Sequence, residues 1–318
     1  MYNIALEHIE SNEYKKAVSI AKKLIKINFT GGYEIMARSF AANDKLQKAV
    51  DTLKFAIEKD ANTFPLWFLL GQYYADLNMF HEAHEAFRNA HDCEISDPDS
   101  INFEIARTLL LEDKYDEAMK LSGQLLSTND ICLQLQVYAL IFCADIKYHR
   151  YEQVLKHERT VIDISNAKES ESISNSLKSS LHSYLATAYW NGQNDKAHAK
   201  THIQDALWLD PRNQSALSLL REINNQSANN SNLYIVNVNG ILSTDSAFLL
   251  STGVKGFYTT IHVVADEKQE CFQFIKEIFP NNFCTQIIID RVNVKKNNCN
   301  ALKGVVFYSG FTYYMCDG

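Results

Sequence analysis

Four alanines recur along the N-terminal part of the chain at a nearly constant spacing. Ala17, Ala49, Ala83 and Ala118 are 32, 34 and 35 residues apart. Each follows a short polar turn and lies in a segment whose apolar residues recur with helical periodicity. A period of this length, with a small residue fixed in register, indicates a repeated pair of helices. One such pair cannot bury its own apolar face, so the period predicts a stack of helical hairpins.

The segment from Trp67 to Ala90 is the most complete copy of this unit. Four residues on one face of a first helix precede a turn at 78–81, and three residues on a second helix follow it: Trp67, Leu70, Gly71, Tyr74, Ala83, Phe87 and Ala90. The pattern resembles the tetratricopeptide repeat. The resemblance implies a right-handed α-solenoid, in which the first helices line a concave groove that binds a peptide or an extended partner segment.

The same register predicts about six hairpins in a repeat domain over residues 1–224. The expected helices or helix pairs are 1–9 with 14–27, the units 31–60, 67–90 and 99–128, 131–149 with 152–164, and 181–190 with a second helix that includes Ala197 and whose register stays open. The segment 165–180 is expected to be a loop or an extra polar turn. A last helix at 213–223 is expected to cover the open end of the stack.

The final part of the chain changes character. Residues 225–232 are small or polar and lack apolar periodicity, so we interpret them as a linker. Beyond it, β-branched and aromatic residues predict strands, and residues 266–279 have helical periodicity. The expected strands are 233–238, 257–265, 285–294 and 304–314. A short helix after the first strand completes a small α+β domain at 233–318, in the order β-(short α)-β-α-β-β.

Composition limits the compartment and the partners. The net charge of −7 argues against a general nucleic-acid surface. The seven cysteines are scattered without metal-type spacing, which favours reduced thiols in a cytoplasmic protein. No apolar run has the length of a membrane span, and no signal peptide is evident at the start. We therefore expect a cytoplasmic protein that binds neither membranes nor nucleic acid; the oligomeric state stays open.

No catalytic motif is evident, and we expect no cofactor. Tyr308-Ser309-Gly310-Phe311 lacks the first glycine of a nucleophile elbow, and Gly253-Val254-Lys255-Gly256 lacks the ending of a phosphate loop. Histidines with metal-like spacing are better explained as surface polar residues, so no metal site is predicted. These are His198 with His202, and His81 with His84, near Glu85 and Cys93.

Aromatic residues and lysines lie together near the end of the sequence. Lys295 and Lys296 precede an aromatic strand at 304–314, a combination that suits stacking on single-stranded nucleic acid. Apolar residues on both faces of that strand instead favour a central strand packed on both sides, and we prefer that interpretation.

The resemblance places the candidate binding residues on the first helices of the repeats. By register these are Glu34, Arg38, Phe68, Gln72, Ala75, Phe103, Arg107 and His182. In the groove, arginines would pair with acidic groups and phenylalanines would anchor apolar side chains. The preferred function is a non-enzymatic scaffold or assembly adaptor for a protein partner. Two alternatives stay open: a transferase or hydroxylase with substrate-selecting repeats, and a regulator that senses a ligand through its C-terminal domain.

Overall fold

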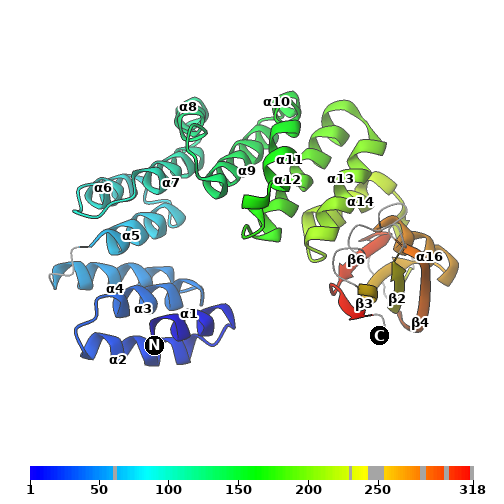
Figure 1. The fold of residues 1–318 in the computed structure, drawn as a ribbon, viewed down its shortest axis with the longest axis horizontal. Coiled ribbons are helices and arrows are strands. Elements are labelled where there is room, and N and C mark those ends of the chain that lie inside the picture. Colours follow the sequence, from blue (N-terminus) through cyan, green and yellow to red (C-terminus); the bar gives the residue numbers. More distant parts are fainter. Residues whose placement is uncertain (60–62, 229–230, 243–253, 280–283, 297–300, 316–318) are drawn as a thin grey trace. The chain divides into compact units, whose positions relative to one another are not determined.

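The chain forms two compact units, Met1–Asn129 and Asp130–Gly318. Their computed structural model describes residues 1–59, 63–228, 231–242, 254–279, 284–296 and 301–315 (Figure 1). The first unit consists of paired helices. They are α1 (Tyr2–Glu10) with α2 (Tyr14–Lys26), α3 (Gly31–Ala41) with α4 (Leu46–Glu58), α5 (Phe64–Asp76) with α6 (Phe80–His91), and α7 (Pro98–Leu111) with α8 (Tyr115–Leu125).

The same backbone conformation forms the turn inside each hairpin. A residue in the left-handed conformation ends each first helix, and it is Asn, Asp or His, the types that tolerate a positive φ best. The six residues are Asn12, Asp44, Asn78, Asp113, His149 and Asn194. In the first five hairpins the next amide donates to the carbonyl five residues earlier, as from Met79 to Tyr74 at 2.8 Å. The turns therefore mark six hairpins, as the sequence predicts.

The alanines that define the repeat period are buried in the structure. Five residues after each turn residue lies a side chain with no exposed surface: Ala17, Ala49, Ala83, Ala118, Val154 and Ala199. Glycine at the reference unit makes room for an aromatic ring, because a Cβ on Gly71 would lie 2.5 Å from Cε1 of Phe87. Helix α5 therefore lies close to the ring of Phe87 at Gly71.

The second unit begins with helices that depart from the regular pattern. They are α9 (Ile131–Lys147), α10 (Tyr151–Lys156), α11 (Glu158–Asn166), the 3₁₀ turn η1 (Lys168–Ser170), α12 (Asn175–Ala188), the π-helical turn η2 (Tyr189–Gln193), α13 (Lys196–Leu209) and α14 (Gln214–Asn224). The single helix expected at 152–164 is divided at His157. Helix α12 begins inside the segment expected to be a loop or polar turn. No helix in the described ranges is both long and apolar enough to cross a membrane.

The π-helical turn sets the register of the sixth hairpin, which the sequence leaves open. Here the amide of Asp195 donates to the carbonyl of Tyr189 at 3.0 Å, six residues back instead of five. The extra residue lengthens the turn before helix α13. In this helix Ala199 is buried and Ala197 is exposed, so Ala199 is the residue at the helix contact.

An antiparallel sheet follows the helices. Its strands are β2 (Asn232–Leu242), β3 (Val254–Ala265), β4 (Cys284–Lys296), β6 (Gly304–Tyr308) and β7 (Thr312–Met315), with helix α16 (Lys268–Glu277) between β3 and β4. The order is β4-β2-β3-β6, and β7 also pairs with β3. Two short strands, β1 (Ser227–Ala228) and β5 (Ala301–Leu302), pair separately. The short helix expected after the first strand would fall on residues 243–253, outside the described ranges.

The last strand pattern is split in two. The expected strand at 304–314 is interrupted after Tyr308, and its two parts pair with different stretches of β3. In the strand order of the described residues, β6 is the last strand and lies at an edge of the sheet. The expectation that residues 304–314 form a central strand is therefore wrong. Tyr308 nonetheless lies in the core with almost no exposed surface, whereas the neighbouring Phe307 is 37% exposed.

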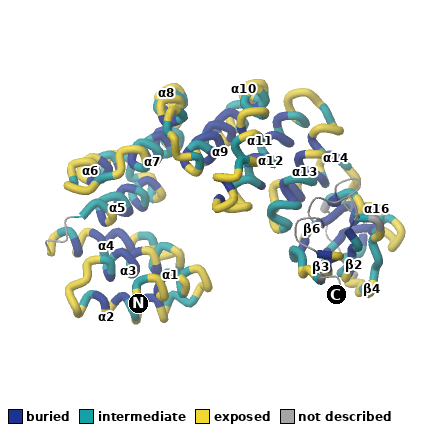
Figure 2. Tube along the Cα trace, viewed as in Figure 1, coloured by how far each residue is buried: buried dark blue, intermediate teal, exposed yellow. Residues whose placement is uncertain are grey.

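One apolar core joins the last helices to the sheet. It contains Leu217 and Leu220 of α14, Val236 of β2, Phe257 of β3 and Ile275 of α16. Figure 2 shows buried residues along the sides where helices and strands of a unit face one another. The division at residues 225–232 remains a prediction. Across it, the structure packs α14 and the sheet into one hydrophobic cluster.

Candidate functional site

Polar side chains connect successive first helices of the first unit. The buried carboxylate of Glu104 on α7 accepts a hydrogen bond from Nε2 of Gln72 on α5 at 2.8 Å and from Nε of Arg107 at 2.7 Å. Nη1 of Arg107 lies 3.0 Å from Oδ1 of Asp76, again on α5. Each charge therefore has a partner within the repeats, which fixes α5 against α7.

A second pair lies on helix α3. Nε of Arg38 donates to Oε1 of Glu34 at 2.9 Å, one helical turn earlier. The hydroxyl of Tyr2 on α1 also bonds to Glu34, and burial together with this bond raises the pKa of Tyr2 to about 12. Glu34 is largely buried, whereas the side chain of Arg38 is 42% exposed. We call the residues Tyr2, Glu34, Arg38, Gln72, Asp76, Glu104 and Arg107 the first-helix network.

A pocket of about 560 Å³ opens at the N-terminal ends of these first helices. Apolar and aromatic side chains dominate its lining: Tyr2, Phe29, Phe64, Pro65, Leu66 and Ile95, with Glu34 from the first-helix network. Phe29 packs edge-on against Tyr2 with 6.0 Å between the ring centroids. Large apolar side chains of the lining stay accessible, since Phe29 is 46% and Ile95 is 82% exposed. We call this cavity the first-helix pocket.

The structure separates the predicted groove residues into groups. Glu34, Arg38, Gln72 and Arg107 belong to the first-helix network, and of these Glu34 also lines the pocket. Phe68 packs between Phe64 and Phe87, at centroid distances of 5.2 and 6.2 Å. Ala75 has no exposed surface, so its expected place on the groove surface is wrong. Phe103 is partly buried.

Apart from Glu34, the pocket residues were not predicted from the sequence. Phe29 and Ile95 come from the connections between hairpins, and Tyr2 and Phe64 begin helices. The register argument considers only the middle of each first helix. A usable signal was present, because a large apolar residue inside a short polar connection, as in Asp92–Asp97, has no core to face.

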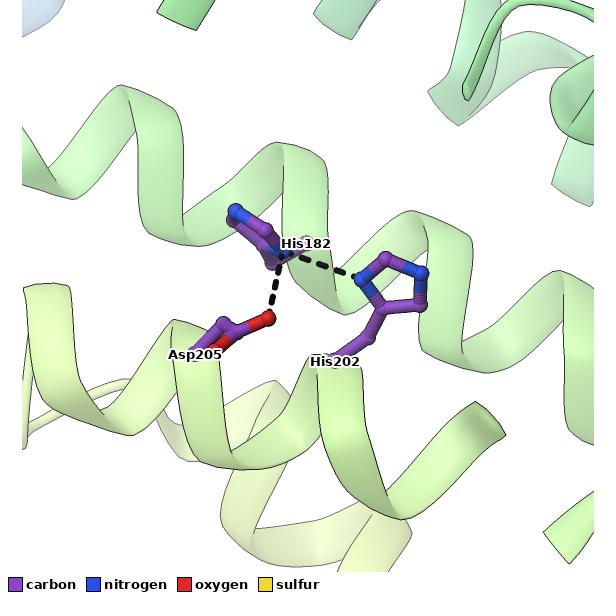
Figure 3. Close-up of side chains that lie close together, drawn as sticks. All are labelled: His182, His202 and Asp205. Atoms are coloured by element: carbon purple, nitrogen blue, oxygen red, sulfur yellow. Dashed lines mark hydrogen bonds and ion pairs between the residues drawn. The ribbon is translucent and has the colours of Figure 1, made fainter. Parts of the chain in front are cut away.

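The second unit brings four titratable side chains together. His182 of α12 and His202 of α13 face each other with 3.0 Å between their Nδ1 atoms. Oδ2 of Asp205 lies 3.7 Å from Nδ1 of His182 (Figure 3). On the other side of the ring, Nε2 of His202 lies 3.0 Å from Oε1 of Glu158. We call His182, His202, Asp205 and Glu158 the histidine cluster.

Burial changes the protonation of this cluster. Desolvation, and next the charge of His202, lower the pKa of His182 to about 4. Desolvation also raises the pKa of Asp205. His182 is therefore neutral near pH 7 and presents a ring nitrogen lone pair. The role of His182 in the partner-binding groove stays a prediction.

The other histidines singled out in the sequence have separate partners. His198 lies 2.7 Å from Oδ2 of Asp195, on the exposed start of α13. His84 pairs with Glu112, and His81 lies 3.5 Å from Glu85. Within the described ranges, the group of His182, His202 and Asp205 is the one set of three or more side chains that converge as metal ligands do.

Comparison with known proteins supports the repeat architecture. A family model described as tetratricopeptide repeat matches residues 1–30 and 64–90, and it matches no residues of the sheet region. A search among curated proteins gives no match.

Solved structures resemble this chain at low sequence identity. The crystal structure of the APC/C hetero-tetramer Cut9-Hcn1 is similar to this chain with a TM-score of 0.51 and 16% identity, over 70% of this chain and 42% of that chain. The chain thus spans less than half the length of that protein. PilF of Pseudomonas aeruginosa has a TM-score of 0.49 and 12% identity, over 70% of this chain and 95% of its own. By motif, turn geometry and family match, residues 1–30 and 64–90 are tetratricopeptide repeats.

Proposed function

We propose that this protein is a non-enzymatic interaction scaffold that binds a partner segment at the first helices of residues 1–129. The tetratricopeptide repeats support the general role of a protein-interaction scaffold. The finer assignment rests on one observation, the open apolar first-helix pocket beside the first-helix network.

The pocket suits a large apolar side chain of the partner. Ile95 and Phe29 expose apolar surface at its rim, Leu66 provides a buried floor, and Phe64 lines the pocket partly buried. Burying one such side chain contributes about 1.5–3 kcal/mol. Anchors of this kind, set in a pocket and surrounded by polar groups, carry much of the affinity of peptide interfaces.

Polar residues beside the pocket would orient the bound segment. Arg38 is the most accessible charged member of the first-helix network, so its guanidinium is available to a partner carboxylate or carbonyl. Phe103 and Gln72 remain part of the surface that we propose for binding the partner segment. Arg107 contributes indirectly, since its charge is already matched by Glu104 and Asp76.

Selection from a displayed library of random peptides, with the full chain as bait, tests this proposal. We expect the enriched peptides to share a large apolar residue. Ile95→Gln should weaken their binding about tenfold to a hundredfold, the equivalent of burying one isoleucine. Leu111→Gln is the matched control, because Leu111 is an exposed apolar residue at the far end of α7.

The two variants distinguish the outcomes. Loss of binding in Ile95→Gln alone supports the pocket. Equal binding by both variants and the unmodified chain would overturn the assignment to the pocket, and failure to enrich any peptide would count against a peptide-binding scaffold. The role of a cytoplasmic assembly adaptor depends on this result and is part of the same proposal.

A further inference from the structure

In the histidine cluster, the carboxylate of Glu158 lies behind the ring of His202. The carboxylate of Glu158 accepts the Nε2–H of His202 at 3.0 Å, and it also accepts the hydroxyl of Tyr189 at 2.6 Å. In the tautomer that this bond selects, Nε2 carries the proton and Nδ1 carries the lone pair. A carboxylate behind a histidine in this way fixes the tautomer of metal-ligating histidines.

Three possible ligand atoms lie close together here. Nδ1 of His202 lies 3.0 Å from Nδ1 of His182, which in turn lies 3.7 Å from Oδ2 of Asp205. One ligand atom from each of the three residues lies within 4.8 Å of the others. In tetrahedral zinc sites with bonds of about 2.0–2.1 Å, neighbouring ligand atoms are about 3.3–3.4 Å apart. The two observed distances lie on either side of that value. His202 and Asp205 are three residues apart on one face of α13, and His182 faces them from α12 (Figure 3).

We propose that His182, His202 and Asp205 bind a zinc ion through Nδ1, Nδ1 and a carboxylate oxygen. Two carboxylates, Asp205 as ligand and Glu158 behind His202, balance the double charge of the ion. The side chain of Asp205 is 44% exposed, which gives the ion a route in and leaves a fourth position for water. The ion joins α12 to α13 and, through Glu158, to α11.

Without an ion, the same geometry is a hydrogen bond between the two Nδ1 atoms, which are 3.0 Å apart. A bound zinc ion would replace this hydrogen bond with two metal–nitrogen bonds. The affinity for zinc therefore distinguishes a metal site from a simple pair of histidines.

The test uses the full, tag-free chain after treatment with a chelator. Zinc chloride is titrated in competition with a chromogenic chelator, and cobalt chloride is added separately to record the visible absorption of a tetrahedral site. We expect one ion per chain. Asp205→Asn and His202→Gln should remove most of the affinity, and Glu158→Gln should lower it about 10- to 100-fold. His198→Gln is the matched control on the same helix and should bind as the unmodified chain does.

Circular dichroism of each chelator-treated variant shows that it is folded; Asp205→Asn, at the most exposed ligand, is the variant expected to keep the fold best. Affinity that is unchanged in Asp205→Asn and His202→Gln would overturn the proposal. The proposal would also be overturned if the unmodified chain bound zinc no more tightly than the double variant His182→Gln with Asp205→Asn. A loss in His198→Gln as large as that in His202→Gln would place the ion at Asp195 instead.

Discussion

Nη1 of Arg221 on α14 donates to the carbonyl oxygen of Val305 on β6 at 2.7 Å. Beside this bond, Leu217 and Leu220 of the same helix share an apolar cluster with the sheet. Glu277 at the end of α16 adds bonds to Lys200 on α13 and Asn224 on α14. The helix expected to cover the end of the repeats is itself covered by the sheet.

A chain that ends at Asn224 should therefore expose the apolar face of α14. We expect it to bind the dye anilinonaphthalene sulfonate and to associate at micromolar concentration, because a large apolar patch on a surface favours association. Analytical ultracentrifugation and dye fluorescence measure this. A monomeric fragment that does not bind the dye would show that the repeats form an independent domain.

Gly71→Ala should destabilise the first unit by about 1–3 kcal/mol. The added methyl group would lie 2.5 Å from the ring of Phe87. This ring is fully buried and cannot move aside without disturbing its neighbours. Urea unfolding followed by circular dichroism measures the change. Gly123→Ala is the control, since nothing lies within 4 Å of its added Cβ. Equal stability of the two variants would contradict the close contact.

Arg107→Met should destabilise the protein by roughly 1–3 kcal/mol, because it leaves the buried carboxylate of Glu104 without its charged partner. The double variant Glu104→Gln with Arg107→Met should regain part of this loss, since it removes both charges. Urea unfolding of the single and double variants provides the comparison. An Arg107→Met protein as stable as the unmodified chain would instead make Arg107 available to a partner.

Stability should fall as the solution becomes more acidic than about pH 6.5. Burial lowers the pKa of His182 from 6.5 to about 4, so between these values the unfolded chain binds a proton that the folded protein does not. The cost is at most about 3 kcal/mol at pH 4. Melting temperatures in chelator from pH 7 to pH 4.5 should fall less steeply for His182→Gln. Parallel curves for the two proteins would exclude His182 as the cause.

The repeat architecture was predictable because local signals agree. The buried alanines, the polar turns and the helical periodicity all report the same hairpin. Prediction fails where a turn changes length. The π-helical turn at Tyr189 adds one residue before α13, and the buried Ala199 lies 45 residues after Val154 instead of one repeat period.

The candidate site was less predictable for a physical reason. Register identifies which residues lie on a first helix, but it cannot show that Arg107 already bonds to Glu104 and Asp76. Nor can spacing bring His182 to His202, which are 20 residues apart on different helices. Both findings depend on tertiary packing between elements.

Site-specific cross-linking tests the central claim most directly. Ile95 is replaced by the photoreactive p-benzoylphenylalanine, and Leu111 is replaced in a parallel chain. Each is irradiated with a selected peptide, and the cross-linked residues are mapped by mass spectrometry. We expect a cross-link from position 95 to the apolar residue of the peptide and none from position 111. Equal cross-linking at both positions, or cross-linking at 111 alone, would contradict binding at the first-helix pocket.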